Sequence, residues 1–512
     1  MLIKTFGGAV QGVDATLITV EVSVSKGIKF FLVGLPDKAV QEAEIRIDTA
    51  LRNTQYKRPG KKIVINMAPA DLKKEGAAYD LPIAIGVLGA SEQINNEYLD
   101  QYIMMGELSL DGTLQPIKGA LPIAILAREK GFKGILLPKH NAMEAAIVGD
   151  INVFGFNNIN EVIEFTNDPS KFSPTKINTR DQFFDSIDNP DFDFSDVKGQ
   201  ENIKRAMEIA AAGGHNLILI GPPGAGKTML AKRFSSILPP MTLHEALETT
   251  KIHSVAGKLK GDIGLVAQRP FRSPHHTISD VALIGGGTNP QPGEVSMAHN
   301  GVLFLDELPE FKRTALEVLR QPLEDRYVSI SRAKFTVEYP ASLMLIASMN
   351  PCPCGYYNHP EKDCICPGGA VQKYLNKISG PLLDRIDLHV EVTPVSFDEL
   401  ADIEPAEKST KIRSRVLKAR EIQNERFKAH KTVHSNAQMT SQQLKNSCIL
   451  SEQCKNLLKN AMNKLDLSAR AYNRILKVAR TIADLDSDDN IQTNHIAEAI
   501  QYRSLDRDGW AG

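Results

Sequence analysis

The sequence predicts a multidomain α/β protein on the strength of three observations. Its 512 residues exceed what one hydrophobic core usually organises. Segments with strand and helix patterns alternate in two stretches, residues 1–165 and 196–395, as in sheets covered by helices. An Asp-, Asn-, Ser- and Pro-rich linker at 166–195 separates these stretches, and residues 396–512 have an almost wholly helical pattern. We therefore expect two α/β domains followed by a helical domain.

Composition and charge narrow the class of protein. Hydrophobic residues make up 42% of the chain and charged residues 24%, as in globular proteins, and the longest apolar runs are too short to cross a bilayer. Residues 1–12 lack the basic start, apolar stretch and cleavage site of a secretory signal, so we expect a cytoplasmic protein without membrane contacts. Lys and Arg total 60 against 61 Asp and Glu, so any contact with nucleic acid would need a local basic patch.

The first stretch has the pattern of a compact mixed α/β domain. Residues 15–24, 29–35 and 61–68 are rich in Val, Ile and Phe and are typical of strands. Residues 38–54, "KAVQEAEIRIDTALRNT", have the apolar spacing of a helix and lie between two of these strands.

The second stretch opens with a nucleotide-binding motif. The apolar run "NLILI" is followed by "GPPGAGKT", which fits G-x-x-x-x-G-K-T, and then by a helical pattern. The glycines let backbone N–H groups surround phosphates, the lysine reaches the β and γ oxygens, and the threonine ligates magnesium. A chance glycine turn is the alternative, but the flanking strand and helix favour ATP and Mg²⁺ as cofactors. The predicted loop residues are Gly221, Pro222, Pro223, Gly224, Ala225, Gly226, Lys227 and Thr228.

Two further apolar strands end in polar residues that complete such a site. The strand at 302–305 is followed by Asp306 and Glu307, which suit the magnesium shell and the polarisation of the attacking water. The strand "SLMLIASMN" ends in Asn350, which could orient that water, although asparagine at a strand end is often only a turn former.

The third stretch is predicted to be helical throughout. Residues 410–427 open it, and residues 468–485, "SARAYNRILKVARTIADL", form its best amphipathic segment.

Taken together, the motifs resemble those of the magnesium-chelatase-like AAA+ ATPases, most closely the YifB/ComM family. The resemblance covers nearly the whole chain and includes "GPPGAGKTML", "RPFRSPHHTISDVALIGGG", "NGVLFLDELPEF", "SMNPCPCGYY" and "SARAYNRILKVARTIADL". It implies an AAA+ core with a helical C-terminal lid, a ring that is a homohexamer, and Asn350 as first sensor. It also makes Arg385 in "LLDRIDL" the arginine finger and Arg470 the second sensor, although either could be a surface ion pair. At Arg326 the family more often has glycine.

The first domain resembles the proteolytic domain of Lon protease, whose chemistry needs a serine and a lysine. Ala78 stands at the position of the serine and Leu121 at that of the lysine, and Lys118 nearby has no nucleophile to activate. We therefore interpret residues 1–165 as a catalytically inactive scaffold or a partner-binding domain.

Four cysteines follow the Asn350 strand within fifteen positions, in a protein expected to be cytoplasmic. Cys352, Cys354, Cys364 and Cys366 form C-x-C-x9-C-x-C, and four thiolates suit a closed, structural tetrahedral Zn²⁺ site. His359 could replace one thiolate. The alternative is four reduced cysteines in a loop rich in glycine and proline.

The remaining question is what the ring would act on. The family resemblance implies a motor on DNA, for branch migration or remodelling of recombination intermediates during DNA uptake. The alternative is a chaperone-like subunit that remodels a protein partner, as in magnesium chelatase. Residues 325–340 decide between them: 327–331 and 335–339 alternate like strands, with Arg332 and Lys334 at the turn. From the residues alone this is an ordinary solvated turn, but related ring ATPases carry a hairpin here that points into the pore.

Overall fold

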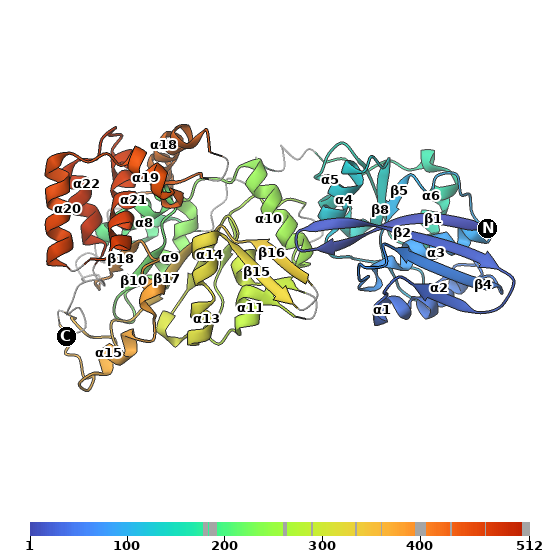
Figure 1. The fold of residues 1–512 in the computed structure, drawn as a ribbon, viewed down its shortest axis with the longest axis horizontal. Coiled ribbons are helices and arrows are strands. Elements are labelled where there is room, and N and C mark those ends of the chain that lie inside the picture. The colour runs from blue at the N-terminus through green and yellow to red at the C-terminus, as the bar shows by residue number, and fades with distance from the viewer. Residues whose placement is uncertain are drawn as a thin grey trace.

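The computed structural model describes residues 1–177, 183, 192–259, 264–287, 290–332, 335–359, 361–394, 406–430, 433–465 and 467–503. The chain is elongated: the N-terminal sheet lies at one end, the second sheet in the middle and the C-terminal helices at the other end (Figure 1). This arrangement confirms the predicted fold class. The predicted linker, residues 166–195, lies partly outside the described residues, so its boundaries stay predictions.

The N-terminal region is built on a seven-stranded mixed sheet with the order β3-β4-β2-β1-β5-β8-β9. Two long strands, β1 (Leu2–Gln11) and β2 (Asp14–Ser25), form a hairpin that closes at Gly12 and Val13. Their apolar side chains alternate with polar ones because one face of the sheet packs on helices. The remaining strands are β3 (Phe30–Val33), β4 (Lys62–Ala68), β5 (Tyr102–Met104), β8 (Gly134–Pro138) and β9 (Asn152–Phe156).

Helices complete this first core. The helix α3 (Asp80–Ala90) is buried along its whole length, as its nearly uniform apolar sequence requires. The predicted single helix at 38–54 is split into α1 (Lys38–Gln41) and α2 (Ala43–Asn53). Three more helices are α4 (Ala120–Glu129), α5 (Lys139–Ala146) and α6 (Ile159–Asn167).

The middle region contains a five-stranded parallel sheet with the order β11-β14-β17-β10-β18. Its three inner strands are fully or almost fully buried, because helices cover both faces of a parallel sheet. The strands are β10 (Leu217–Ile220), β11 (Phe271–Arg272), β14 (Val302–Leu305), β17 (Met344–Met349) and β18 (Leu388–Glu391).

The segments between these strands carry two small hairpins. β15 (Tyr327–Arg332) pairs antiparallel with β16 (Phe335–Pro340), which confirms the strands of the predicted hairpin. Lys334 and the side chain of Arg332 lie outside what the structure describes. β12 (Gly285–Gly286) and β13 (Gln291–Pro292) form the second hairpin, and the hydroxyl of Tyr339 in β16 donates to the carbonyl of Pro290 at 2.7 Å.

Helices flank the central sheet. The helix α14 (Arg320–Asp325) is capped by Arg326, whose φ of 63° is left-handed, a conformation that favours glycine, the residue that the resemblance implies at this position. Eight more α-helices among the described residues of this region are α8 (Glu201–Gly213), α9 (Lys227–Arg233), α10 (Leu243–Val255), α11 (Asp280–Ile284), α12 (Glu294–Met297), α13 (Arg313–Glu317), α15 (Ala370–Leu375) and α16 (Gly380–Leu383).

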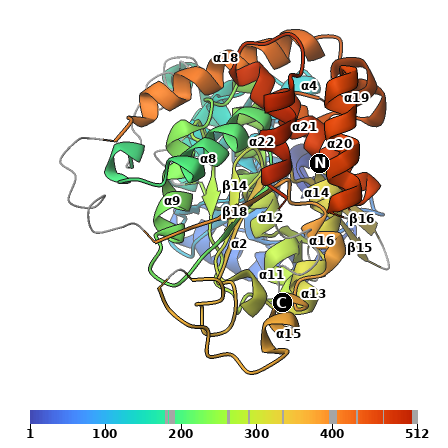
Figure 2. The same cartoon turned by 90° about the vertical axis from the view of Figure 1, so that its left-hand side faces the viewer.

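The C-terminal region is helical, as predicted. Its longest helices are α18 (Ser409–Phe427) and α21 (Ala469–Leu485), which match the two predicted segments within one residue. Both pack on α8, so the helical region shares one hydrophobic core with the central sheet (Figure 2). The others are α19 (Ser441–Ser447), α20 (Glu452–Lys464) and α22 (Thr493–Gln501). Among the described residues, no helix is both long enough and apolar enough to cross a membrane.

Candidate active site

The predicted phosphate loop joins β10 to α9, the context that its motif requires. Gly224 and Gly226 have φ of 81° and 82°, which residues with a side chain rarely adopt. A methyl group on Gly221 would lie 2.4 Å from the carbonyl oxygen of Val392, so only glycine fits there. The sequence therefore places its glycines where the loop must turn and where backbone approaches backbone.

Lys227 points back into this loop. Its Nζ donates to the carbonyl oxygens of Gly221 and Pro222 at 2.7 and 2.9 Å, and to Oδ1 of Asn350 at 3.1 Å. Burial lowers the pKa of this lysine, and the nearby carboxylates of Asp306 and Glu307 oppose that shift. The structure thus brings the predicted lysine and the predicted first sensor into direct contact.

The two predicted magnesium residues also meet. The hydroxyl of Thr228 donates to Oδ2 of Asp306 at 2.7 Å, so both groups reach the same space beside the loop. Oxygen ligands of this kind are what Mg²⁺ prefers, and the pair fits the cofactor that the motif implies. Ser348, on the neighbouring strand β17, donates a short hydrogen bond to Oδ1 of Asp306 and fixes the carboxylate.

Glu307 is held beside Asp306 by an unusual backbone. Its φ is 54°, and its N–H donates to Oδ1 of Asp306 at 3.1 Å. The carboxylate is more than half exposed, and Oε2 lies 3.7 Å from Nδ1 of His276. The sequence analysis missed Ser348 and His276; Ser348 could have been found, because it lies two residues before Asn350 on the same strand.

Arg385 and Arg470 lie elsewhere, at the opposite end of the sheet from the phosphate loop. Arg385 comes just before β18, which runs parallel to β10, and its carbonyl accepts a hydrogen bond from the Asn216 side chain at the start of β10. The phosphate loop follows the other end of β10. The four residues of that strand span about 13 Å, at about 3.3 Å per residue. In a single chain the two arginines are therefore separated from Lys227.

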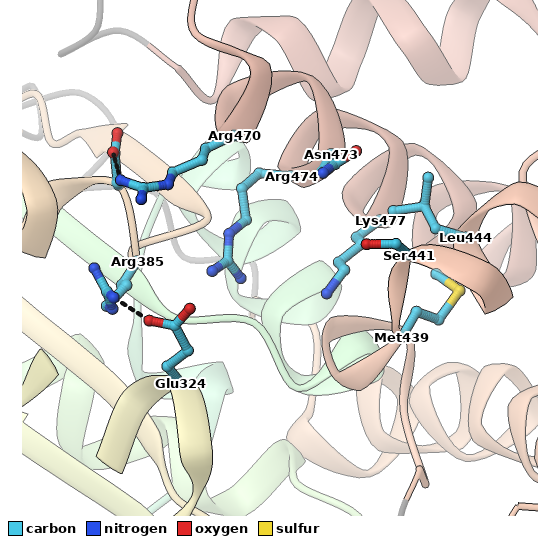
Figure 3. Close-up of a pocket in the computed structure, with 10 residues that line it drawn as sticks. Glu324, Arg385, Met439, Ser441, Leu444, Arg470, Asn473, Arg474 and Lys477 are labelled. Carbon is cyan, nitrogen blue, oxygen red and sulfur yellow. Dashed lines mark hydrogen bonds and ion pairs between the residues drawn. The ribbon is translucent and has the colours of Figure 1, made fainter. Parts of the chain in front are cut away.

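These two arginines line one cavity of about 150 Å³ between the central sheet and α21. Figure 3 shows Arg470, Arg474 and Lys477 projecting from α21 toward Arg385, whose guanidinium pairs with Glu324. None of the described residues that line the cavity belongs to the phosphate loop. Burial, reinforced by the charge of Arg474, lowers the pKa of Lys477 to about 8. The cavity is thus lined by four basic side chains, of which Arg385 and Arg470 pair with the acids Glu324 and Asp384. Arg474 and Lys477 are members that the sequence analysis missed.

The buried carboxylate of Asp387 links the elements that surround this cavity. Asp387 forms an ion pair with Arg474, whose guanidinium nitrogen lies 2.9 Å from Oδ1. The other oxygen, Oδ2, accepts the N–H of Asn216 at 3.2 Å and lies 3.1 Å from Nδ1 of His215. Burial raises the pKa of Asp387, but Arg474 and His215 outweigh it and hold the pKa well below its usual range. The segment that carries Arg385 and the helix α21 are therefore fixed to each other.

The four clustered cysteines converge on one point. Their sulfur atoms all lie within 4.8 Å of one another, and three of the separations are 3.3, 3.7 and 3.6 Å. A tetrahedral zinc site with bonds of about 2.3 Å would place its sulfurs about 3.8 Å apart. The donor set therefore fits a metal ion. His359 is not in this group, and its Nδ1 accepts backbone N–H groups of Glu361 and Lys362 instead.

The cysteine loop lies directly against the phosphate loop. A methyl group on Gly355 would lie 2.5 Å from Cδ of Pro223, so the backbone of Gly355 lies close against the proline ring. Whatever holds the cysteine loop in shape therefore also supports the nucleotide site.

The fold and this site define a class of protein: a P-loop ATPase of the AAA+ type, in which a parallel sheet carries the phosphate loop, the Asp-Glu pair and Asn350. Comparison with known proteins narrows the class. Residues 193–400 match the family described as magnesium chelatase, subunit ChlI; residues 20–141 match subunit ChlI of Mg-chelatase, and 406–503 its C-terminal family.

The chain is also similar to individual proteins, two of them over nearly its full length and one over a shorter stretch of 155 residues. It is 45% identical over 506 residues to competence protein ComM of Haemophilus influenzae, covering 98% of this chain and 97% of the relative. It is 44% identical over 503 residues to the uncharacterized protein YifB of Escherichia coli, covering 98% and 96%. Lon protease 2 of Bacillus subtilis is 32% identical over 155 residues, covering 28% and 27%. The chain belongs to the YifB/ComM family of magnesium-chelatase-like proteins.

Proposed function

We propose that this chain is a ring-forming ATPase in which neighbouring subunits share each ATP site, and that the ring is a hexamer. The observation that carries the proposal is the separation of Lys227 from Arg385 and Arg470 at opposite ends of the sheet. Two arginines that line one cavity, with no phosphate in reach in their own chain, suit the γ-phosphate of an ATP held by the next subunit.

Within one subunit, the residues around the phosphate loop would bind and orient the reactants. Lys227 would neutralise the β and γ oxygens, and Thr228 and Asp306 would hold Mg²⁺, which supplies charge neutralisation when bound. The exposed carboxylate of Glu307 would polarise the attacking water, with Asn350 orienting it.

We propose DNA as the polymer on which the ring acts, for branch migration or remodelling of recombination intermediates during DNA uptake. Two observations support this: the ATPase region carries the β15–β16 hairpin, and one full-length relative is named a competence protein. Arg332 and Lys334 lie at the tip in the sequence, so six tips would offer a dozen cations to a phosphate backbone.

The match to magnesium chelatase families favours a second candidate, a chaperone-like subunit that remodels a protein partner. In that case the inactive Lon-like domain would be the surface that a partner binds. Ala78 and Leu121, at the positions of the protease serine and lysine, leave that domain without peptidase chemistry.

Measuring ATP hydrolysis alone and with single-stranded, duplex, forked and four-way DNA tests the proposal. DNA should stimulate hydrolysis, and the double variant Arg332→Ala, Lys334→Ala should lose the stimulation and strand movement while keeping basal hydrolysis. If the double variant binds and moves DNA as the wild type does, the hairpin is only a turn and the chaperone candidate is favoured.

We also propose that the four cysteines hold one structural Zn²⁺. Four sulfur ligands leave no open coordination position, so the ion would support the loop rather than take part in hydrolysis. Burial raises the pKa of the Cys354 thiol, but the backbone of Tyr356 and the neighbouring Cys352 thiol outweigh it and lower the pKa to about 6, whereas the pKa of Cys366 is raised. A thiolate stabilised in this way suits a metal ligand.

A further inference from the structure

The N-terminal domain contacts the β15–β16 hairpin directly. The tip of the β1–β2 hairpin extends from the N-terminal sheet and ends beside β15 and β16 (Figure 1). At that tip, Gly12 has a φ of 63°, and a methyl group on it would lie 3.0 Å from Cγ1 of Val337 and 3.5 Å from the carbonyl oxygen of Glu338. The backbone of the tip therefore lies against β16 with no space between them.

The next residue continues this contact with an apolar side chain. Val13 packs against the hydrophobic cluster beneath the β15–β16 hairpin, which includes Val328, Ile330 and Tyr339, all buried. Asp14 adds an ion pair at 4.0 Å with Lys251 of α10, a surface contact that contributes little. Burial of Val13 is thus the main attraction at the tip.

A second contact fixes the N-terminal domain on α10. The N–H of Gly119 donates to the carbonyl of Ser254 at 3.1 Å, and the Ser254 hydroxyl donates a short hydrogen bond to Glu144. Leu121, at the position of the protease lysine, is fully buried in an apolar cluster that also contains Met241 and Ala246 of the ATPase region. Leu121, at the position of the lysine in Lon protease, therefore lies in the interface between the N-terminal domain and the ATPase region.

The N-terminal domain therefore contacts the ATPase region at two separate places, the tip against β16 and the anchor on α10. The Glu144 side chain is buried and accepts the N–H of Leu121 at 3.0 Å as well as the Ser254 hydroxyl. Opening this contact would remove the Ser254 hydroxyl from the Glu144 carboxylate, and losing a hydrogen bond to a charged group costs free energy.

We propose that the inactive Lon-like domain positions the β15–β16 hairpin, with Gly12 and Val13 as the positioning residues. The inference rests on the proposed function only for what the hairpin then does with DNA. The domain itself acts as a brace: its anchor is α10, and its long β1–β2 hairpin supports β16 from the side.

The test is Val13→Asp in the full-length chain, compared with Thr16→Asp as the matched control. Thr16 is exposed on the same hairpin, so the control adds the same charge away from β16. Hydrogen exchange measured by mass spectrometry should be about tenfold faster in peptides of residues 327–332 and 335–340 of Val13→Asp, and unchanged in the control. Unchanged exchange in β4 and α3 shows that the N-terminal domain remains folded. The variant Gly12→Ala, strained because Gly12 has a left-handed backbone, should also speed exchange in the β15–β16 hairpin.

ATP hydrolysis with and without forked DNA is measured on the same proteins. Faster hairpin exchange together with reduced DNA stimulation and unchanged basal hydrolysis supports the inference. Faster exchange with full DNA stimulation also supports the brace but contradicts the role of the hairpin in the proposed function. If the hairpin exchanges at the wild-type rate in both Val13→Asp and Gly12→Ala, the inference is wrong, whether or not DNA still stimulates ATP hydrolysis.

Discussion

A nitrogen of the Arg470 guanidinium lies 3.2 Å from a carboxylate oxygen of Asp384, the residue immediately before Arg385. The predicted second sensor therefore sits beside the predicted arginine finger, and both would act on the ATP of a neighbour. We predict that Arg470→Ala and Lys227→Ala proteins, each inactive alone, recover ATP hydrolysis when mixed. One partner supplies an intact phosphate loop, and the other supplies intact arginines.

The mixing experiment separates the two arrangements of the second sensor. If Arg470 served the phosphate loop of its own chain, no subunit in the mixture would have a complete site and hydrolysis would stay absent. The control is the double variant Lys227→Ala, Arg470→Ala, which has neither half-site and should restore nothing when mixed with either single variant. Arg385→Ala should behave as Arg470→Ala does.

Glu307→Gln should bind ATP but hydrolyse it very slowly, because the amide cannot polarise water as the carboxylate does. Lys227→Ala should lose hydrolysis for a different reason, the missing positive charge at the β and γ oxygens. Equilibrium binding of ATP and single-turnover hydrolysis distinguish the two effects. Normal turnover in Glu307→Gln would remove that residue from the proposed role.

Protein purified without added metal should contain one zinc per chain by elemental analysis. The variant Cys364→Ser, Cys366→Ser should lose the ion and unfold at a lower temperature, because metal binding contributes folding free energy to the loop. ATP hydrolysis should also fall, since the loop packs on Pro223 of the phosphate loop. Cys448→Ser, a buried cysteine whose thiol donates to the carbonyl of Leu476, is the control and should keep its zinc. Wild-type protein that is free of metal and normally stable would contradict the assignment.

DNA affinity should weaken as salt is added, because cations that contact phosphates release counterions. The double variant Arg332→Ala, Lys334→Ala should have a shallower dependence of the logarithm of affinity on the logarithm of salt concentration, since fewer phosphates are neutralised. Titrations at several salt concentrations measure this slope. Equal slopes in wild type and variant would mean that these two residues do not touch the backbone.

The sequence was informative wherever local chemistry decides the structure. The phosphate loop needs glycines with left-handed backbone at Gly224 and Gly226, and the motif names them without any knowledge of the fold. The long amphipathic segment ending at Leu485 likewise gave α21 within one residue of its bounds. The alternating residues around Ile330 gave the β15–β16 hairpin.

Other parts of the site depend on contacts between distant segments, which a pattern cannot supply. His276 lies 3.7 Å from Glu307 only because the segment after β11 returns to the end of β14. Lys477 belongs to the cationic cavity because α21 packs against the central sheet. The glycine that the family prefers at Arg326 is explained by its left-handed φ, which no spacing rule could reveal.

The four residues of β10 also separate the phosphate loop, which binds ATP, from the arginines that line the cavity at the other end of the strand. A lone subunit would load ATP at one end of that strand and hold its arginines, idle, at the other end. If neighbouring subunits share each site, as proposed, hydrolysis per chain would rise steeply with protein concentration rather than stay constant, because two chains would have to meet before either one turns over. Dilution alone would then lower ATP hydrolysis per chain, so the number of copies in the cell would set the activity.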